Sequence, residues 1–262
     1  MADPIEQFQI HKVVDLPDIT LPVLGTVDLA VTNSHIAMTI AFVAVVGFLT
    51  AVTSGAKVVP GRLQAVGETL FGMIDGVTDS IIGHHEGRKY FPFVFSLFLF
   101  ILAMHVLGML LVFTATSQLA ITGTFALLTI LLVIGVGFYK HGLGFFALFW
   151  PTSAPLLIRP VVGLIEFLSF LLRPITLALR LFGNMLGGHI ALKIFAGFVV
   201  SMGAVAMAGG VGLLGLPVAA LSMGMVIGLT ALEFLVAFLQ AFVFAVLASI
   251  YLNDVVNLGH GH

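Results

Sequence analysis

The sequence predicts an all-α protein that crosses a membrane several times. Of its 262 residues, 60% are hydrophobic and 8% are charged, and the mean hydropathy is +1.20. Soluble domains carry about 25% charged residues, so a soluble globular protein is excluded. The apolar residues gather in segments close to or above the roughly 20 residues with which a helix spans a bilayer. The chain has no cysteine, which excludes disulfides and thiol-ligated metals.

Residues 1–33 form the first predicted region, an extramembrane arm. Its first twenty residues include the acidic residues Asp3, Glu6, Asp15 and Asp18. Residues 1–20 contain no apolar core of the kind that a secretory signal peptide needs, so we expect this arm to stay on the protein.

Residues 34–141 are predicted to hold three ordinary transmembrane helices. Each is an apolar run of spanning length, and they cover about residues 34–52, 91–113 and 119–139. Asn33 or Ser34 is expected to cap the first helix, because both side chains accept hydrogen bonds from backbone N–H groups at a helix start.

An amphipathic helix is predicted between the first two spans, at about residues 62–83. Glu68, Asp75 and Asp79 recur along it at helical spacing. Its opposite, apolar stripe comprises Leu63, Val66, Leu70, Ile74 and Val77. Because a helix with one charged and one apolar face lies along a membrane surface, we expect an interfacial helix here.

Basic residues near the ends of these spans predict the orientation of the chain. If the three spans alternate in direction, these residues all fall on one side of the membrane. They are Lys57, Arg62, Arg88, Lys89 and Lys140. Because short cytoplasmic loops are enriched in Lys and Arg, we expect the amino terminus outside and the carboxy terminus in the cytoplasm.

Two long apolar segments dominate the remaining region, residues 142–262. They cover about residues 161–207 and 218–253, and a glycine-rich turn ending at Pro217 separates them. Each is longer than a perpendicular span requires, so the two form a hairpin of helices that are strongly tilted or broken within the membrane. Pro174 lacks a backbone N–H and is expected to bend or loosen the first helix.

Ionisable residues concentrate in this hairpin. Arg180 lies in the middle of the first long helix, where a permanent charge costs about 3 kcal/mol on insertion scales. Glu166, Arg173 and Arg180 are seven residues apart and therefore project from one helical face. Asn184 joins this face one turn after Arg180. An arginine cannot release its proton, which suits it to attract a carboxylate and to block the passage of protons.

The second long helix carries Glu233 and Gln240, again seven residues apart on one face. On the first helix, His189 lies nine positions after Arg180, on roughly the opposite side. Both His and Glu side chains take up and release protons. If Glu233 pairs with His189, Arg180 has no acidic partner in the hairpin, because Glu166 lies about 21 Å away along the same helix. A carboxylate of another subunit is then expected to face Arg180.

Ordinary structural roles stay open for several of these residues. Glu166 and Arg173 form either a structural ion pair or part of an ion pathway. Asn184 and Gln240 are either functional or ordinary interhelical hydrogen-bonding residues, which are common in membrane bundles. Lys193, which has a long apolar stem, is expected to reach the head-group region.

The motif Arg180-Leu-Phe-Gly-Asn-Met resembles that of subunit a of the F-type ATP synthases, and the resemblance extends over nearly the whole chain. It includes Pro174-Ile-Thr-Leu-Ala-Leu before the motif, Leu239-Gln-Ala-Phe-Val-Phe-Ala-Val-Leu and Gly87-Arg-Lys-Tyr-Phe-Pro-Phe. The final Tyr251-Leu-Asn-Asp is similar to the alphaproteobacterial branch. The resemblance implies a stator subunit beside the rotating c-ring, associated with b-type peripheral-stalk subunits in a bacterial inner membrane.

The resemblance also implies roles for the ionisable residues. Arg180 matches the essential arginine that faces the c-ring carboxylate and prevents protons from short-circuiting between two half-channels. His189 and Glu233 match a pair in the half-channel open to the outside. Their order along the chain is swapped relative to many bacterial relatives, which suggests that the two side chains meet across the helix interface. Glu166 matches an acidic position of the cytoplasmic half-channel.

Further polar residues have supporting roles in this interpretation. Asn184 and Gln240 match polar positions close to the arginine, and Arg173 is assigned the same supporting role. His105 stands where relatives commonly have Asn, and it is either another proton relay or a hydrogen-bond donor. The histidines at His84-His85-Glu86 and at the carboxy terminus lack a convincing third ligand, so we expect no metal site and no cofactor.

These observations predict the proton-conducting stator subunit of an ATP synthase, which is not an enzyme on its own. Protons would pass from outside by His189 and Glu233 to a c-ring carboxylate and leave by Glu166. The chain lacks a G-x-x-x-x-G-K-[ST] loop, so nucleotide chemistry belongs to other subunits, and we expect no nucleic-acid partner.

Two other classes of function were weighed against this one. A self-contained secondary transporter would bind an anionic substrate at Arg180, but the sequence shows no inverted repeat. An intramembrane enzyme would need a nucleophile and its base, and Ser169, Ser201 and Ser222 have no convincing partners.

Overall fold

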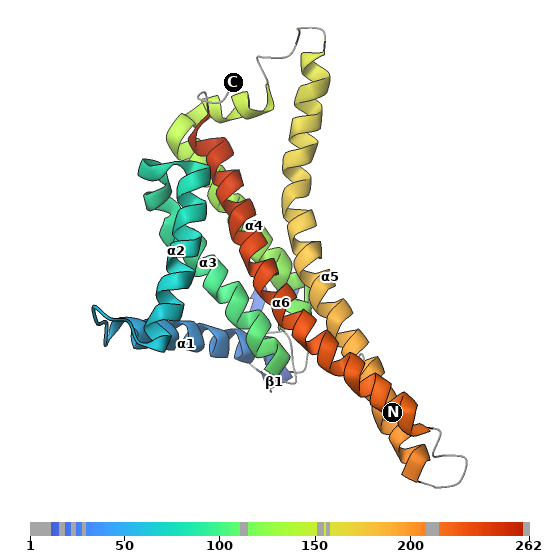
Figure 1. Cartoon of the computed structure of the whole chain (residues 1–262). Coiled ribbons are helices and arrows are strands. Elements are labelled where there is room, and N and C mark those ends of the chain that lie inside the picture. Colours follow the sequence, from blue (N-terminus) through green and yellow to red (C-terminus); the bar gives the residue numbers. More distant parts are fainter. Residues whose placement is uncertain are drawn as a thin grey trace. The chain divides into compact units, whose positions relative to one another are not determined.

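The computed structural model describes residues 12–15, 19–21, 25–27, 30–110, 115–150, 155, 158–207 and 215–258. These residues are predominantly helical (Figure 1), which confirms the predicted all-α class. The helices are α1 (Asn33–Thr53), α2 (Arg62–Ile82), α3 (His84–Leu110), α4 (Leu119–His141), α5 (Arg159–Met207) and α6 (Gly215–Val256). Two short 3₁₀ helices also occur, η2 (Ala115–Ser117) and η3 (Gly142–Phe149).

Five helical segments in the described part of the chain are long and apolar enough to cross a membrane. They are Asn33–Thr53, His84–Leu110, Leu119–Phe149, Arg159–Met207 and Gly215–Val256. The amphipathic helix α2 is not among them. The protein is therefore a multi-pass membrane protein, as the composition predicted.

The chain folds as two compact units. The first contains Met1–Ala41, Met104–Gln118 and Phe182–Leu239, and the second contains Phe42–Ala103, Leu119–Leu181 and Gln240–His262. The division runs through α1, α3, α5 and α6. The first unit therefore contains the end of α5, the start of α6 and the turn between them, and the second contains the start of α5 and the end of α6.

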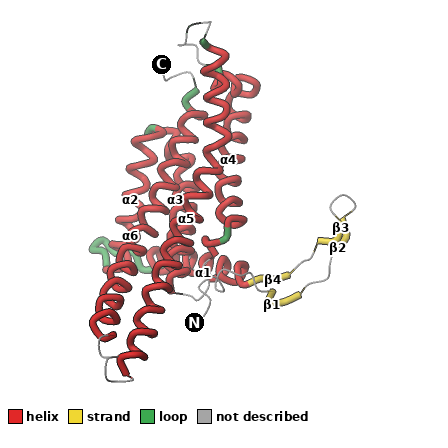
Figure 2. The backbone as a smooth tube through the Cα atoms, turned by 90° about the vertical axis from the view of Figure 1, so that its right-hand side faces the viewer, coloured by secondary structure: helices red, strands yellow, loops and turns green. Residues whose placement is uncertain are grey.

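Four short strands precede α1 in the first unit, and the sequence analysis did not predict them. Strands β1 (Lys12–Asp15) and β4 (Ala30–Thr32) pair antiparallel, as do β2 (Ile19–Leu21) and β3 (Gly25–Val27). Figure 2 shows them as two small ladders (yellow). Each strand has only three or four residues, and such short segments carry little periodicity, so the pattern along the chain did not reveal them.

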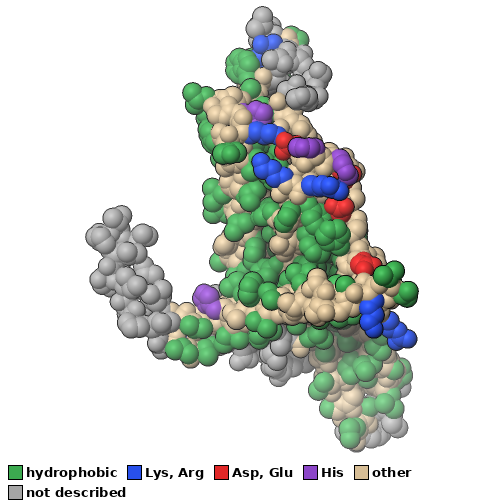
Figure 3. All heavy atoms as spheres, turned by 90° about the vertical axis from the view of Figure 1, so that its left-hand side faces the viewer, with side chains coloured by type: hydrophobic (Ala, Val, Ile, Leu, Met, Phe, Trp, Pro, Cys, Tyr) green, Lys and Arg blue, Asp and Glu red, His purple; other side chains and the backbone are tan. Residues whose placement is uncertain are grey.

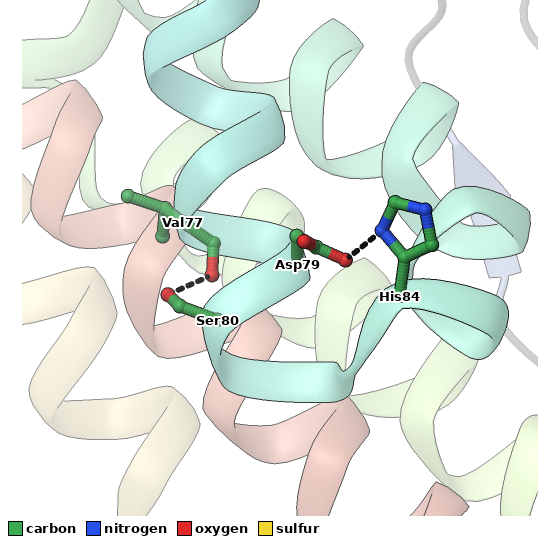
Figure 4. Close-up of polar contacts among 4 residues, drawn as sticks. All are labelled: Val77, Asp79, Ser80 and His84. Carbon is green, nitrogen blue, oxygen red and sulfur yellow. Dashed lines mark hydrogen bonds and ion pairs between the residues drawn. The ribbon is translucent and has the colours of Figure 1, made fainter.

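A tight corner joins α2 to α3 in the second unit. Gly83 ends α2 with a φ of 97°, a conformation that glycine adopts without steric cost. Figure 4 shows the polar contacts here: Ser80 Oγ donates to Val77 O at 2.9 Å, and His84 Nδ1 hydrogen-bonds Asp79 Oδ1 at 2.8 Å. Because α3 begins at His84, its first turns contain the charged and histidine residues that precede the apolar run predicted from residue 91.

The buried face of α2 differs from the predicted apolar stripe. Leu63 and Val66 of that stripe are 50% and 52% exposed. The buried residues are Gly67, Ile74, Thr78 and Ile82. A Cβ added to Gly67 would lie 2.7 Å from Cγ1 of Val52 in α1, so a small residue sets the packing here. Leu63 and Val66 belong to the stripe expected to face the membrane, which stays a prediction, while close approach at Gly67 decides which residues of α2 pack within the chain.

Charged and aromatic side chains meet where α3 begins and α4 ends. Lys140 Nζ lies 2.8 Å from Glu86 Oε1. Lys89 Nζ lies 5.7 Å and 6.0 Å from the ring centroids of Tyr90 and Tyr139. Figure 3 shows basic, acidic and histidine side chains gathered beside a broad hydrophobic surface. Aromatic and basic residues together are typical of the boundary between bilayer and water.

One face of α6 in the second unit is fully buried and consists largely of small residues. The residues with no exposed surface are Ala241, Phe244, Ala245, Ala248, Ser249, Leu252 and Val255. A Cβ added to Gly137 of α4 would lie 2.7 Å from Cγ1 of Val255. Asn257 Nδ2 donates to Ile82 O at 3.1 Å, at the end of α2. Small residues let membrane helices approach closely, so the end of α6 is held between α2 and α4.

Candidate functional site

The first long helix of the hairpin, α5, continues through Pro174 without a break. Pro174 has no N–H for the carbonyl group four residues earlier. Thr176 Oγ1 forms additional hydrogen bonds to the carbonyls of Leu172 and Arg173, at 3.1 Å and 3.0 Å. Of the two arrangements expected for an overlong segment, a break is thus excluded at this proline, and the polar residues of α5 keep their helical spacing.

Arg180 projects from the exposed side of α5. Its neighbours Leu177 and Leu181 are buried, whereas Arg180 itself is exposed. Glu166 and Asn184, which share its helical face, are exposed as well. Among the residues that the structure describes, Arg180 and Glu166 form no ion pair. The positive charge therefore faces away from the core of this chain, where a group of another molecule can reach it.

Arg173 differs from these residues because it is tied to α6 within the second unit. Its Nη1 donates to Asp254 Oδ2 at 2.7 Å. Its guanidinium carbon lies 4.9 Å from the ring centroid of Tyr251 and 5.7 Å from that of Phe170. The alternative of an Arg173–Glu166 pair is therefore not what the structure has: Asp254 is the acidic partner of Arg173 among the described residues.

Glu233 lies against α5 within the first unit, at the position directly before His189. A Cβ added to Gly188 would lie 3.0 Å from Glu233 Cδ and 3.1 Å from its Cγ. Both carboxylate oxygens of Glu233 are buried and have no hydrogen-bond partner among the described residues. His189 is itself half-buried. Glu233 therefore packs against α5 at Gly188, but its carboxylate forms no hydrogen bond to His189, so the meeting of these two side chains stays a prediction.

The remaining supporting residues lie in different environments. Gln240 on α6 is 4% exposed, and His105 on α3 is fully buried. Both have polar or ring interactions with other groups, as does the exposed Asn184 on α5. Gln240 belongs to the second unit and the other two belong to the first. Buried polar residues of this kind fit either of the interpretations that the sequence left open.

Metal ligation has no candidate within the described ranges. No group of three or more His, Cys, Asp or Glu side chains is close enough there to hold a metal ion. His84 instead hydrogen-bonds Asp79. The carboxy-terminal histidines fall in residues 259–262, outside the described residues.

Two parts of this site were missed by the sequence analysis. Asp254 was named only as the last residue of the Tyr251-Leu-Asn-Asp stretch. An acid near the end of the second long helix is nevertheless a natural partner for a basic residue in the first part of the first long helix. Gly188 carries no chemical group, and only its adjacency to His189 in a Gly187-Gly188-His189 run could have drawn attention to it.

Comparisons with known proteins identify the family of the chain. The profile of the family described as ATP synthase A chain matches residues 35–253. Similar proteins include the ATP synthase subunit a of Hyphomonas neptunium, 49% identical over 97% of this chain and 96% of its own length. That of Chelativorans sp. is 46% identical over 99% of both chains, and that of Agrobacterium fabrum is 47% identical over 98% of this chain and 99% of its own. As the resemblance of the arginine motif predicted, the chain belongs to the ATP synthase A chain family.

Proposed function

We propose that this chain is the proton-conducting stator subunit of an F-type ATP synthase in the inner membrane of a bacterium. The observation that carries the proposal is Arg180, an exposed arginine in the middle of a helix apolar enough to cross a membrane. A permanent charge at that depth is costly unless a partner compensates it. In a rotary synthase, that partner is the essential carboxylate of the c-ring.

The c-ring carboxylate would bring Arg180 the negative charge that the described part of this chain does not offer it. Attraction to the arginine favours the ionised carboxylate and so promotes release of its proton as it passes. Arginine cannot itself carry a proton onward. Arg180 therefore acts as a barrier that forces protons to travel with the ring instead of leaking past it.

His189 and Glu233 would line the half-channel that opens to the outside. The packing of Glu233 against Gly188 supports this role, because it holds a buried carboxyl group on the stretch of α5 that carries His189. His105, on α3 of the same unit, is either a further relay in this half-channel or a hydrogen-bond donor to it.

Glu166 would belong to the half-channel that opens to the cytoplasm. It lies in the first turns of α5, exposed and on the same helical face as Arg180. A proton released by the ring carboxylate would leave past this acid. Asn184 and Gln240 would support the arginine from the two long helices.

The helices would be arranged as the sequence suggests. In this proposal α1, α3 and α4 cross the bilayer as ordinary spans, α2 lies at its surface, and α5 and α6 form a strongly tilted hairpin facing the c-ring. The basic residues after α1, at the start of α3 and at the end of α4 would lie in the cytoplasm. The amino terminus would then be outside, and b-type peripheral-stalk subunits would hold the chain stationary.

Each proton that crosses contributes about 2.3 kcal/mol per 100 mV of membrane potential. One ATP requires several such steps, so rotation of the ring must sum them. A stator that leaked at Arg180 would dissipate this energy without rotation. The arginine is therefore the residue at which the proposal is tested.

The test is the Arg180→Ala variant in membranes that carry the assembled complex. We expect loss of both ATP synthesis and ATP-driven proton pumping, with the subunit still present in the complex. Arg88→Ala is the matched control, because Arg88 is also an exposed arginine but belongs to the first turns of α3 and not to either long helix. We expect the control to keep the activity of the unchanged complex.

Two results would contradict the proposal. If Arg180→Ala pumps and synthesises ATP at near-normal rates, the arginine is structural. If the purified chain alone, reconstituted in liposomes, takes up an anionic substrate, a secondary transporter explains Arg180 better.

A further inference from the structure

The side chain of Arg173 is enclosed by three residues of the second unit. Asp254 accepts a hydrogen bond from its Nη1 at 2.7 Å. Tyr251, one turn before Asp254 on α6, places its ring centroid 4.9 Å from the guanidinium carbon, and Phe170 on α5 lies at 5.7 Å. Both rings are buried, each 8% exposed. A planar guanidinium that is paired at its edge and covered by rings is fixed in both position and orientation.

This cluster joins the start of α5 to the end of α6. The side chains of Arg173 and Asp254 are only 22% and 29% exposed, so water screens their attraction less than in a pair on an open surface. The carboxylate is also held through its own helix, because the adjoining Leu252 and Val255 have no exposed surface. The Arg173–Asp254 contact therefore ties α5 to a closely packed part of α6.

Arg173 lies two turns before Arg180 on the same face of an unbroken helix. Seven residues of α-helix correspond to about 10.5 Å, a distance over which a packed helix is rigid. Leu177 and Leu181, between and beside the two arginines, are buried at 2% and 0% exposure. A rotation or slide of α5 at Arg173 would therefore displace Arg180 by nearly the same amount.

We propose that Asp254 and Tyr251 are positioning residues for Arg180: they hold Arg173 and so fix the rotation and the axial position of α5 against α6. The inference rests on the proposed function, because it assigns this cluster to the stator's charge barrier. Asp254 acts through geometry and not by carrying protons. Its carboxylate holds Arg173, which lies two helical turns before Arg180, the residue proposed to face the c-ring.

The experiment uses assembled complexes with Arg173→Ala, Asp254→Ala and Tyr251→Leu. Displacing a reacting group by about 1 Å costs up to a hundredfold in rate, and we expect the two alanine variants to lower ATP-driven proton pumping by about tenfold. We expect a smaller loss for Tyr251→Leu, which removes the ring but keeps the ion pair. Passive proton leak through the membranes should rise in the alanine variants, because a misplaced Arg180 is a poorer barrier.

The ion pair between Lys140 and Glu86 is the matched control. It has a 2.8 Å contact, and its side chains are 31% and 30% exposed, close to the values at Arg173 and Asp254. It joins α4 to α3 and does not touch α5. Lys140→Ala and Glu86→Ala should therefore leave pumping per hydrolysed ATP unchanged.

Rescue separates positioning from proton transfer. The double variant Arg173→Gln with Asp254→Asn has no titratable group at either position, but two amides can still hydrogen-bond each other. We expect it to recover pumping to within about threefold of the unchanged complex, a difference below 1 kcal/mol. No recovery in this pair, together with loss in Asp254→Asn alone, would identify Asp254 as a proton carrier and overturn the inference.

The outcomes also distinguish this inference from the function on which it rests. If Arg180→Ala abolishes pumping but the Asp254 variants behave like the Lys140 and Glu86 controls, the positioning role is wrong and the stator function stands. If Arg180→Ala keeps pumping, the stator function itself fails. Measuring the amount of the subunit in the purified complex identifies any variant that fails to assemble. In that case, pumping by the double variant Arg173→Gln with Asp254→Asn decides the question.

Discussion

At the scale of single residues, a missing side chain matters as much as the charged ones. Glu233 occupies the space that a side chain at position 188 would fill. The neighbouring Gly187 has nothing within 4 Å of its missing Cβ. Two adjacent glycines on α5 therefore differ in what they do: one makes room for a carboxyl group of the proposed outer half-channel, and the other leaves open space.

The Gly188→Ala variant tests this difference. The added methyl group would collide with the Glu233 side chain, so we expect ATP synthesis and ATP-driven pumping to fall several-fold. The effect cannot come from a weaker helix, because alanine favours a helix over glycine by about 0.5–1 kcal/mol. Gly187→Ala is the control and should retain normal rates. Equal behaviour of the two variants would show that Glu233 needs no fixed position beside α5.

The sequence supplied the ionisable candidates for the site, which stay predictions, but not their partners. Arg180, Glu166, Glu233 and His189 could be chosen from the chain alone, because an ionisable group in an apolar helix is costly and therefore informative. The partner of Arg173 could not, since Asp254 lies 81 positions away. Pairing between distant helices depends on their register, and no local pattern contains that register.

At the scale of elements, small residues decide how the helices pack. Gly137 of α4 is closely approached by Phe145 of η3 and by Val255 of α6. Gly135, two residues earlier on the same helix, has nothing within 4 Å. The closely packed end of α6 therefore depends on one glycine of α4, and a larger side chain there would push the elements apart.

Gly137→Leu should destabilise the second unit, whereas Gly135→Leu should not. Overpacking a close contact typically costs about 1–3 kcal/mol. We expect a lower melting temperature for the purified complex with Gly137→Leu and a smaller amount of subunit in membranes. Both variants replace glycine by the same residue in the same helix, so helix propensity cancels. A normal melting temperature for Gly137→Leu would show that α4 and α6 have room to separate.

The same physical reason explains where the prediction of elements failed. Hydrophobic patterns predicted helices at about 34–52, 62–83, 91–113, 119–139, 161–207 and 218–253, and the structure has a helix over each of these stretches. The residues of α2 that pack within the chain could not be predicted from its apolar stripe, because they include Gly67 and Thr78, and a hydrophobicity pattern gives small residues no weight. Strands β1 to β4 were missed because segments so short have no recognisable period.

At the scale of the whole molecule, the number of crossings decides where the ends of the chain lie. The described residues contain five helical segments suited to cross a membrane. An odd number of crossings places the two ends on opposite sides. The basic residues after α1 assign the cytoplasmic side, so the strands before α1 would face outward and the end of α6 would face the cytoplasm.

Single cysteines test this topology directly, because the chain has none of its own. Val13 in β1 and Val58 after α1 are both exposed valines on opposite sides of the first candidate span. A membrane-impermeant thiol reagent should label Val13→Cys from outside intact cells. It should label Val58→Cys only in inverted vesicles, where the cytoplasmic face is accessible. Labelling of both from one side would mean that α1 does not cross. The reverse labelling would invert the orientation, and Glu166 would then lie toward the outside.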